Sequence, residues 1–142
     1  MHYCSAWKQF FPGDSFLYDY HYMWNQFRDW GDYGSAEILW KDLVNLEEAG
    51  FDGYVSCQQT RVFAPAGFGM YVMAETLWNR SRTFETLERE YFQMVYGDHA
   101  ETVLSYCKEL SALSYMEQPE NDDPGVCAGA AKKLKAAADL IR

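Results

Sequence analysis

The sequence comprises 142 residues, of which 49% are hydrophobic and 18% aromatic, and its formal net charge is −9. This length and composition indicate one packed globular unit and exclude a disordered chain. The acidic balance argues against a nucleic-acid partner, because phosphate binding requires clustered lysines and arginines. Lys132, Lys133 and Lys135 come nearest to such a cluster, and their pattern is typical of a solvated helix face.

The sequence lacks the signals of a membrane or exported protein. No apolar run approaches the ~20 residues of a membrane-spanning helix. The segment MHYCSAWKQFFPGDS has no basic region followed by an apolar stretch, so we expect no signal peptide and assign no localisation. The cysteines are too widely separated for a zinc motif, and we expect neither a metal nor another cofactor; a disulfide is neither required nor excluded. They are Cys4, Cys57, Cys107 and Cys127.

Residues 16–30, FLYDYHYMWNQFRDW, are the most informative segment because aromatic side chains crowd them. The first half, FLYDYHYM, predicts a strand, since aromatic residues suit a pleated, half-buried surface. Alternation along that strand places Asp19 and His21 on one face and the neighbouring tyrosines, Tyr18, Tyr20 and Tyr22, on the other.

A strand–helix–strand unit is predicted next. After the loop RDWGDYG, Ser35 is expected to cap a helix that has Glu37 in its first turn and ends at Gly50. The segment FDGYVSCQ then predicts a short buried strand. A crossover of this kind implies that the two strands lie parallel. The stripe expected to be buried on the helix is Leu39, Leu43 and Leu46.

The remaining pattern is helical. Helices are predicted over 67–78, from Thr83 to Gly97, from a capping box at Asp98 and Glu101, and over 126–141. We therefore divide the chain into residues 1–66, with the strands and the crossover helix, and residues 67–142, a helical extension. The apolar stripes expected on these helices are Met70, Met73, Ala74 and Leu77; Leu87, Tyr91, Met94 and Val95; Val103, Leu104, Cys107, Leu110 and Leu113; and Val126, Ala130, Leu134, Ala137 and Ile141.

Two parallel strands make an incomplete sheet, because parallel sheets are normally covered on both faces and contain several strands. A full (β/α)8 barrel needs roughly 250 residues. The predicted fold class is therefore α/β, as the C-terminal portion of a TIM-type (β/α)8 barrel, with two strands, followed by a helical extension. The chain would be a fragment or a module that another chain completes, and an open sheet edge favours self-association.

The order of the segments resembles a known family. FLYDYHYMW is followed by EEAGFDGYVSCQ and by a tail with A-x-x-L-W-N at 74–79, Y-F-x-x-x-Y-G at 91–97 and Y-x-x-x-L at 106–110. Over residues 14–113 the chain is similar to the C-terminal part of a bacterial glycoside-hydrolase-like family described as a domain of unknown function. The resemblance implies a barrel distantly like those of α-glucuronidases and β-hexosaminidases, a role in polysaccharide degradation, and full-length relatives that are periplasmic or extracellular.

The resemblance leaves the catalytic residues unassigned. In related barrels the catalytic carboxylates lie on a middle strand that this chain lacks. Hydrolysis needs two carboxyl groups about 5–9 Å apart, and Asp19 could be one of them only beside a second group from elsewhere. We therefore expect the isolated chain to be inactive.

Seven residues are predicted to contact a glycan, because they lie in the aromatic strand or follow the two strands, on the side where α/β barrels bind ligands. Aromatic rings suit stacking on sugars, and amide, guanidinium and carboxylate groups hydrogen-bond hydroxyls or a uronate. These residues are Asp19, Tyr20, His21, Trp24, Trp30, Gln58 and Arg61. The alternative for each is a structural role in the core, in a buried polar network or in a loop.

The leading hypothesis is a fragment of a carbohydrate-active protein that contributes contacts to an oligosaccharide or polysaccharide. The first alternative is a helical protein-interaction module, in which the aromatic residues of 16–30 are buried against helices or a partner. The second alternative is a truncated gene product without independent function.

Overall fold

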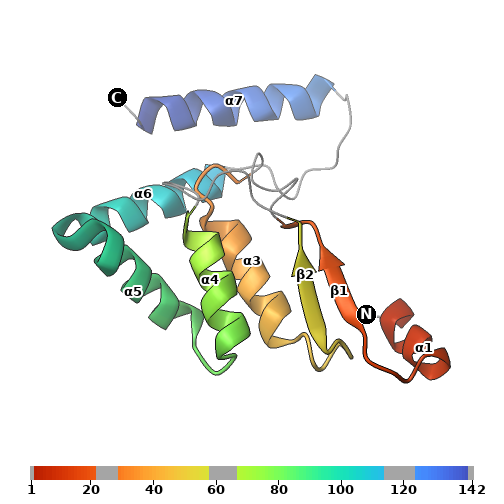
Figure 1. Ribbon diagram of the computed structural model, residues 1–142. Coiled ribbons are helices and arrows are strands. Elements are labelled where there is room, and N and C mark those ends of the chain that lie inside the picture. Colours follow the sequence, from red (N-terminus) through yellow and green to blue (C-terminus); the bar gives the residue numbers. More distant parts are fainter. Residues whose placement is uncertain (1, 22–28, 58–66, 114–123, 141–142) are drawn as a thin grey trace.

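The computed structural model describes residues 2–21, 29–57, 67–113 and 124–140, and it is a helix-rich α/β structure (Figure 1). The predicted α/β class and the predominance of helix are confirmed. The elements are α1 (His2–Phe10), β1 (Phe16–Asp19), α3 (Tyr33–Val44), β2 (Gly53–Ser56), α4 (Gly67–Trp78), α5 (Phe84–Tyr96), the 3-10 turn η2 (Gly97–His99), α6 (Ala100–Leu113) and α7 (Pro124–Leu140).

The two strands form the predicted parallel unit. β1 and β2 pair with Phe16 opposite Gly53, and α3 connects them in the chain. β1 is shorter than predicted, because it ends at Asp19. The Asp19 carboxylate accepts a hydrogen bond from the backbone N–H of His21 over 3.1 Å. An aspartate that bonds the backbone two residues further on favours a turn over an extended strand.

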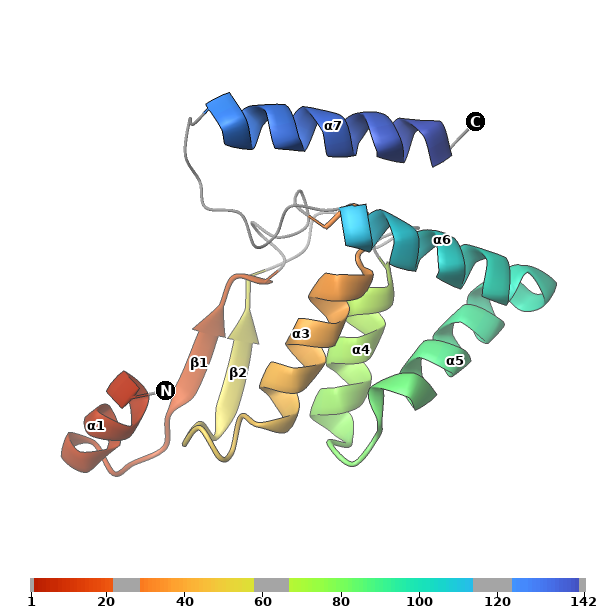
Figure 2. The same ribbon diagram turned by 180° about the vertical axis from the view of Figure 1, so that it is seen from behind.

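The helices α3 and α4 lie side by side and pack against one face of the sheet (Figures 1 and 2). Leu39 and Leu43 of α3 are buried against Tyr54 of β2 and against Met70 and Met73 of α4. Because side chains alternate along a strand, this cluster fixes which face of the sheet the helices cover.

The larger core is helical and is centred on Phe68 of α4. The Phe68 ring lies 5.2 Å from the rings of Tyr91 and Phe92, 5.6 Å from Phe84 and 6.0 Å from Tyr33. Ring pairs at these separations add favourable contacts to the area that they bury. The buried residues of this core are Ala36, Phe68, Val72, Phe84, Leu87, Tyr91, Phe92, Ala100, Leu104 and Cys107.

The helix α3 differs from the prediction at both ends. It begins at Tyr33, so Ser35 lies inside its first turn, Glu37 lies beyond that turn, and Ser35 is not the cap. The Ser35 N–H donates to the Asp29 carboxylate over 2.6 Å, and this loop side chain satisfies the helix start. The helix ends at Val44, and Gly50, with a φ of 89°, belongs to the following turn.

The predicted bounds of α4 and α5 are confirmed, but parts of their stripes are wrong. The Thr83 hydroxyl caps α5 by accepting from the Thr86 N–H, and Gly97 ends that helix. The residues buried on α4 are Phe68, Gly69, Val72 and Thr76, because α4 packs against both α3 and α5. Ala74, Leu77, Met94 and Val95 are exposed.

The last two helices follow the prediction in part. The residues buried on α6 include Leu104, Cys107 and Leu110, as expected. The stripe predicted on the final helix falls on side chains outside the described part of the chain, although α7 itself is present. The short helix α1 was not predicted.

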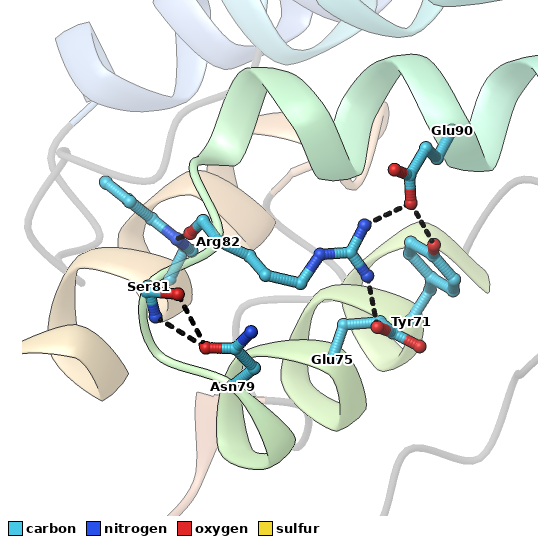
Figure 3. Close-up of polar contacts among 7 residues, drawn as sticks. Tyr71, Glu75, Asn79, Ser81, Arg82 and Glu90 are labelled. Atoms are coloured by element: carbon cyan, nitrogen blue, oxygen red, sulfur yellow. Dashed lines mark hydrogen bonds and ion pairs between the residues drawn. The ribbon is translucent and has the colours of Figure 1, made fainter.

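Arg82 joins α4 to α5 through a set of ion pairs (Figure 3). Its guanidinium donates to Glu75 of α4 and to Glu90 of α5. In the turn before it, the Asn79 side-chain oxygen accepts from the N–H of Ser81 over 3.0 Å and from its hydroxyl over 2.7 Å. These contacts tie α4, which carries Phe68, to α5, whose aromatic rings pack on Phe68.

The sheet face opposite the helices is open in the described part of the chain. Phe16 and Tyr18 are 64% and 51% exposed, and Val55, which lies opposite Tyr18, is exposed on the same side. Parallel sheets are usually covered on both faces. This open face, defined here as Phe16, Tyr18, Tyr20 and Val55, departs from that pattern. None of the described helices combines the length and the apolar character needed to cross a membrane.

Candidate functional site

Asp19 and His21 lie together at the carboxyl end of β1, on the face that packs against α3. The His21 Nδ1 is 2.8 Å from the Asp19 carboxylate, and the Tyr54 hydroxyl donates to the same carboxylate. The His21 Nε2 lies 3.4 Å from the carboxylate of Asp42 on α3. The side chains of Asp19 and His21 are largely buried. These four residues therefore form a polar network that joins both strands to α3.

The network holds opposite charges side by side. Burial alone would raise the pKa of the Asp19 carboxyl, but hydrogen bonds from His21 and Tyr54 outweigh it and lower that pKa to about 2. Burial would likewise lower the pKa of His21, but its hydrogen bond with Asp19 and the charges of Asp19 and Asp42 raise that pKa above its ordinary value. The two carboxylates therefore favour the protonated form of His21.

We expect the charge on His21 to make the stability depend on pH. Because the folded pKa of His21 is raised, its contribution is complete below about pH 6.5 and is lost as pH rises through the raised value. His21→Gln should therefore lower the melting temperature most in mildly acidic solution, and the difference from the parent should shrink as the solution becomes alkaline. Circular dichroism melts across this pH range measure the effect.

Asp42→Asn provides the control for this pH dependence. It removes one of the two charges beside His21 and should move the loss of stability to lower pH. A difference between His21→Gln and the parent that stays constant with pH would show that the imidazolium does not stabilise the network.

Tyr20 lies on the opposite side of the strand, as the alternation predicts. It is 47% exposed, and its ring packs edge-on against that of Tyr18 at 5.2 Å. Cys57, which follows β2, lies close enough to Tyr18 to raise the pKa of its phenol. Two phenol rings and a thiol thus border the open face at the carboxyl end of the sheet.

The remaining predicted site residues are placed in part. Trp30 is half-buried in the loop before α3. Trp24, Gln58 and Arg61 lie outside the described residues. Among the described residues, the structure brings Asp19 together with His21 and places Tyr20 on the other face.

Sequence reasoning missed a second polar cluster, at the start of α3. Asp29 is 2% exposed, and its carboxylate accepts from the N–H groups of Gly31 and Ser35 and from the Ser111 hydroxyl. The Ser111 oxygen in turn accepts from the N–H groups of Tyr33, over 3.2 Å, and Gly34, over 3.3 Å. The first three N–H groups of α3 are therefore satisfied by two side chains from outside the helix.

The same loop also passes unusually close to α6. A Cβ atom on Gly31 would lie 2.0 Å from the carbonyl oxygen of Cys107. Only glycine permits this approach without a shift of the backbone. The contact brings Ser111 of α6 within reach of Asp29.

Asp32 is the second buried carboxyl of this loop. It is 3% exposed, has a φ of 56°, and accepts from the N–H of Gly69 in the first turn of α4 over 3.2 Å. Its backbone carbonyl also accepts from the N–H of Ala36 over 3.3 Å. The signal available in the sequence was an aspartate directly before a helix, the residue type preferred there.

The described ranges contain no group of three or more histidine, cysteine or acidic side chains arranged to hold a metal ion. Comparison with protein-family models, with curated proteins and with solved structures gives no match for this chain.

Proposed function

We propose that this chain supplies part of a glycan-binding wall in a carbohydrate-active, glycoside-hydrolase-like protein of (β/α)8 type. The observation that supports the proposal is the exposed pair Tyr18 and Tyr20 on the open face, at the carboxyl end of a parallel βαβ unit. Ligands of α/β barrels bind at this end of the strands.

The open face has the character expected of a barrel interior. In a (β/α)8 barrel the helices cover the outer face, and side chains of the inner face fill the centre in layers. Phe16, Tyr18 and Val55 would then form such layers, and Tyr20, beyond the end of β1, would lie at the mouth. A phenol ring there offers an apolar surface to sugar C–H groups and a hydroxyl for hydrogen bonds.

Asp19 and His21 take a positioning role in this proposal. They face α3, away from Tyr20, and the Asp19 carboxylate already accepts from His21 and Tyr54. A glycosidase acid or nucleophile must instead reach the glycosidic bond. The catalytic carboxylates would therefore come from residues outside this chain.

Titration calorimetry of the full chain with uronate- and hexosamine-containing oligosaccharides tests the proposal. Loss of one stacking ring costs about 1 kcal/mol, so Tyr20→Ala should weaken binding at least about fivefold. The control is Trp78→Ala, which removes an indole that is 90% exposed on α4. Failure of both sugar classes to bind, or equal losses in the two variants, would overturn the proposal.

The exposed apolar surface supports a second candidate, a protein-interaction module. Trp7 and Phe11 are exposed and stack on each other at 4.5 Å. Each described strand pairs along one edge only, and an unpaired edge can accept a strand from another chain or from a second copy.

Two measurements separate the candidates. Acrylamide quenching with and without oligosaccharide reports whether the indoles respond to sugar, and sedimentation at several protein concentrations reports self-association. The interaction module would be favoured if the indoles are protected from acrylamide both with and without sugar and if the apparent mass rises with protein concentration.

A further inference from the structure

The loop 29–32 lies where the first turns of α3 and α4 approach α6 (Figure 1). Asp29 and Asp32 are both almost completely buried there. Two buried carboxyl groups in one short loop are costly unless each charge is compensated. Their hydrogen bonds show that the compensation is unequal.

The Asp29 carboxylate is well supplied with donors. It accepts from the N–H groups of Gly31 and Ser35 and from the Ser111 hydroxyl, so both of its oxygens act as acceptors. These three donors compensate the loss of water around the buried side chain.

Asp32 has a much poorer environment for a charge. In the described part of the chain, the groups that interact with Asp32 are the N–H of Gly69 on α4, the Asp29 carboxylate, the phenol of Tyr91 on α5 and the thiol of Cys107 on α6. None of these four carries a formal positive charge, and Asp29 repels a second anion. A proton on Asp32 removes that repulsion.

We propose that this junction is a pH-sensitive latch, in which protonated Asp32 holds loop 29–32 against the first turn of α4 and loss of the proton loosens that contact. The device uses a carboxyl group where proteins more often use histidine. Loss of the proton would act on loop 29–32, which lies directly before α3.

The direction of the response follows from the surroundings of Asp32. Burial, in the main, raises the pKa of this carboxyl to about 8; the Gly69 hydrogen bond opposes the rise, and the charge of Asp29 adds to it. The folded chain therefore keeps a proton that the unfolded chain releases near its ordinary pKa. The contribution to stability is complete below about pH 4 and is lost as pH rises through the folded pKa.

Nuclear magnetic resonance tests the latch directly. The carboxyl carbon of Asp32 and the amide of Gly69 should titrate together, in mildly alkaline solution. Hydrogen-exchange protection of the Gly69 amide, corrected for intrinsic exchange, should fall by about tenfold or more between about pH 6 and about pH 9. Amides of α5 near Leu87 serve as the reference and should remain protected.

Asp32→Asn is the decisive variant. Asparagine keeps an oxygen for the Gly69 N–H, tolerates a positive φ and cannot ionise. The Gly69 amide of this variant should show neither the titration nor the loss of protection. The latch is overturned if the Asp32 carboxyl titrates in the ordinary acidic range, if the variant loses protection as the parent does, or if α5 opens together with Gly69.

Discussion

Replacing Phe68 with alanine is expected to lower the free energy of unfolding by about 3–5 kcal/mol. Phe68 is 1% exposed, and its ring packs against those of four other aromatic residues, one on α3 and three on α5. Truncation leaves a cavity that these rings cannot fill without leaving their own contacts. Since domains are stable by about 5–15 kcal/mol, the variant should unfold at much lower urea concentration when monitored by circular dichroism.

Phe16→Ala is the matched control for this core substitution. It removes the same atoms from a side chain that is 64% exposed on the open face, and the expected change is within about 0.5 kcal/mol. Equal losses for the two variants would contradict the assignment of Phe68 as the centre of the core.

Asp29→Asn should destabilise the chain by about 2–3 kcal/mol, although it changes only one atom of the side chain. Both carboxylate oxygens of Asp29 accept hydrogen bonds, on one side from Ser35 and on the other from Gly31 and Ser111. An amide would point its NH₂ group at one of these donors and leave a buried N–H unsatisfied. Urea unfolding at neutral pH measures the loss.

The same exchange at Asp32 provides the comparison for Asp29. The hydrogen bond from Gly69 needs a single acceptor oxygen, which asparagine retains, so Asp32→Asn should leave the stability at neutral pH unchanged or higher. Both variants replace one carboxylate oxygen by an NH₂ group in the same loop. A loss of stability in Asp29→Asn alone would therefore show that Asp29 needs its second acceptor oxygen. Loss of stability in both would indicate that the loop requires two charges.

Local signals predicted the elements whose ends are determined by nearby residues. Thr83 caps α5 through a contact only three residues away, and Gly97 ends the same helix with a φ of 53°. The start of α3 could not be predicted in this way. Its N–H groups depend on Asp29 and on Ser111, and these two residues are 82 positions apart in the chain.

The candidate site was predicted in part for a similar reason. Alternation separates Asp19 and His21 from Tyr18 and Tyr20, but it does not tell which set meets the helices, because both faces of a parallel strand are normally apolar. The choice is made by Tyr54 and Asp42, which lie beyond the segment and contact Asp19 and His21.

The motifs behind the family resemblance serve the fold in this structure. Asn79 of the first motif shapes the turn before α5, and Tyr91 and Phe92 of the second pack on Phe68. Cys107 and Leu110, the second and last positions of the third, are buried on α6. These positions stabilise the helical part of this chain, and the glycan proposal depends instead on the open face.

The hydrogen bond between Ser111 and Asp29 has a consequence for synthesis of the chain. A ribosome that adds ~5–20 residues per second needs ~4–16 s to pass from the first of these residues to the second, 82 positions later. Throughout that interval the nascent α3 has no Ser111 hydroxyl to accept from its first two N–H groups. The beginning of α3 must therefore be completed late, after most of α6 has been made.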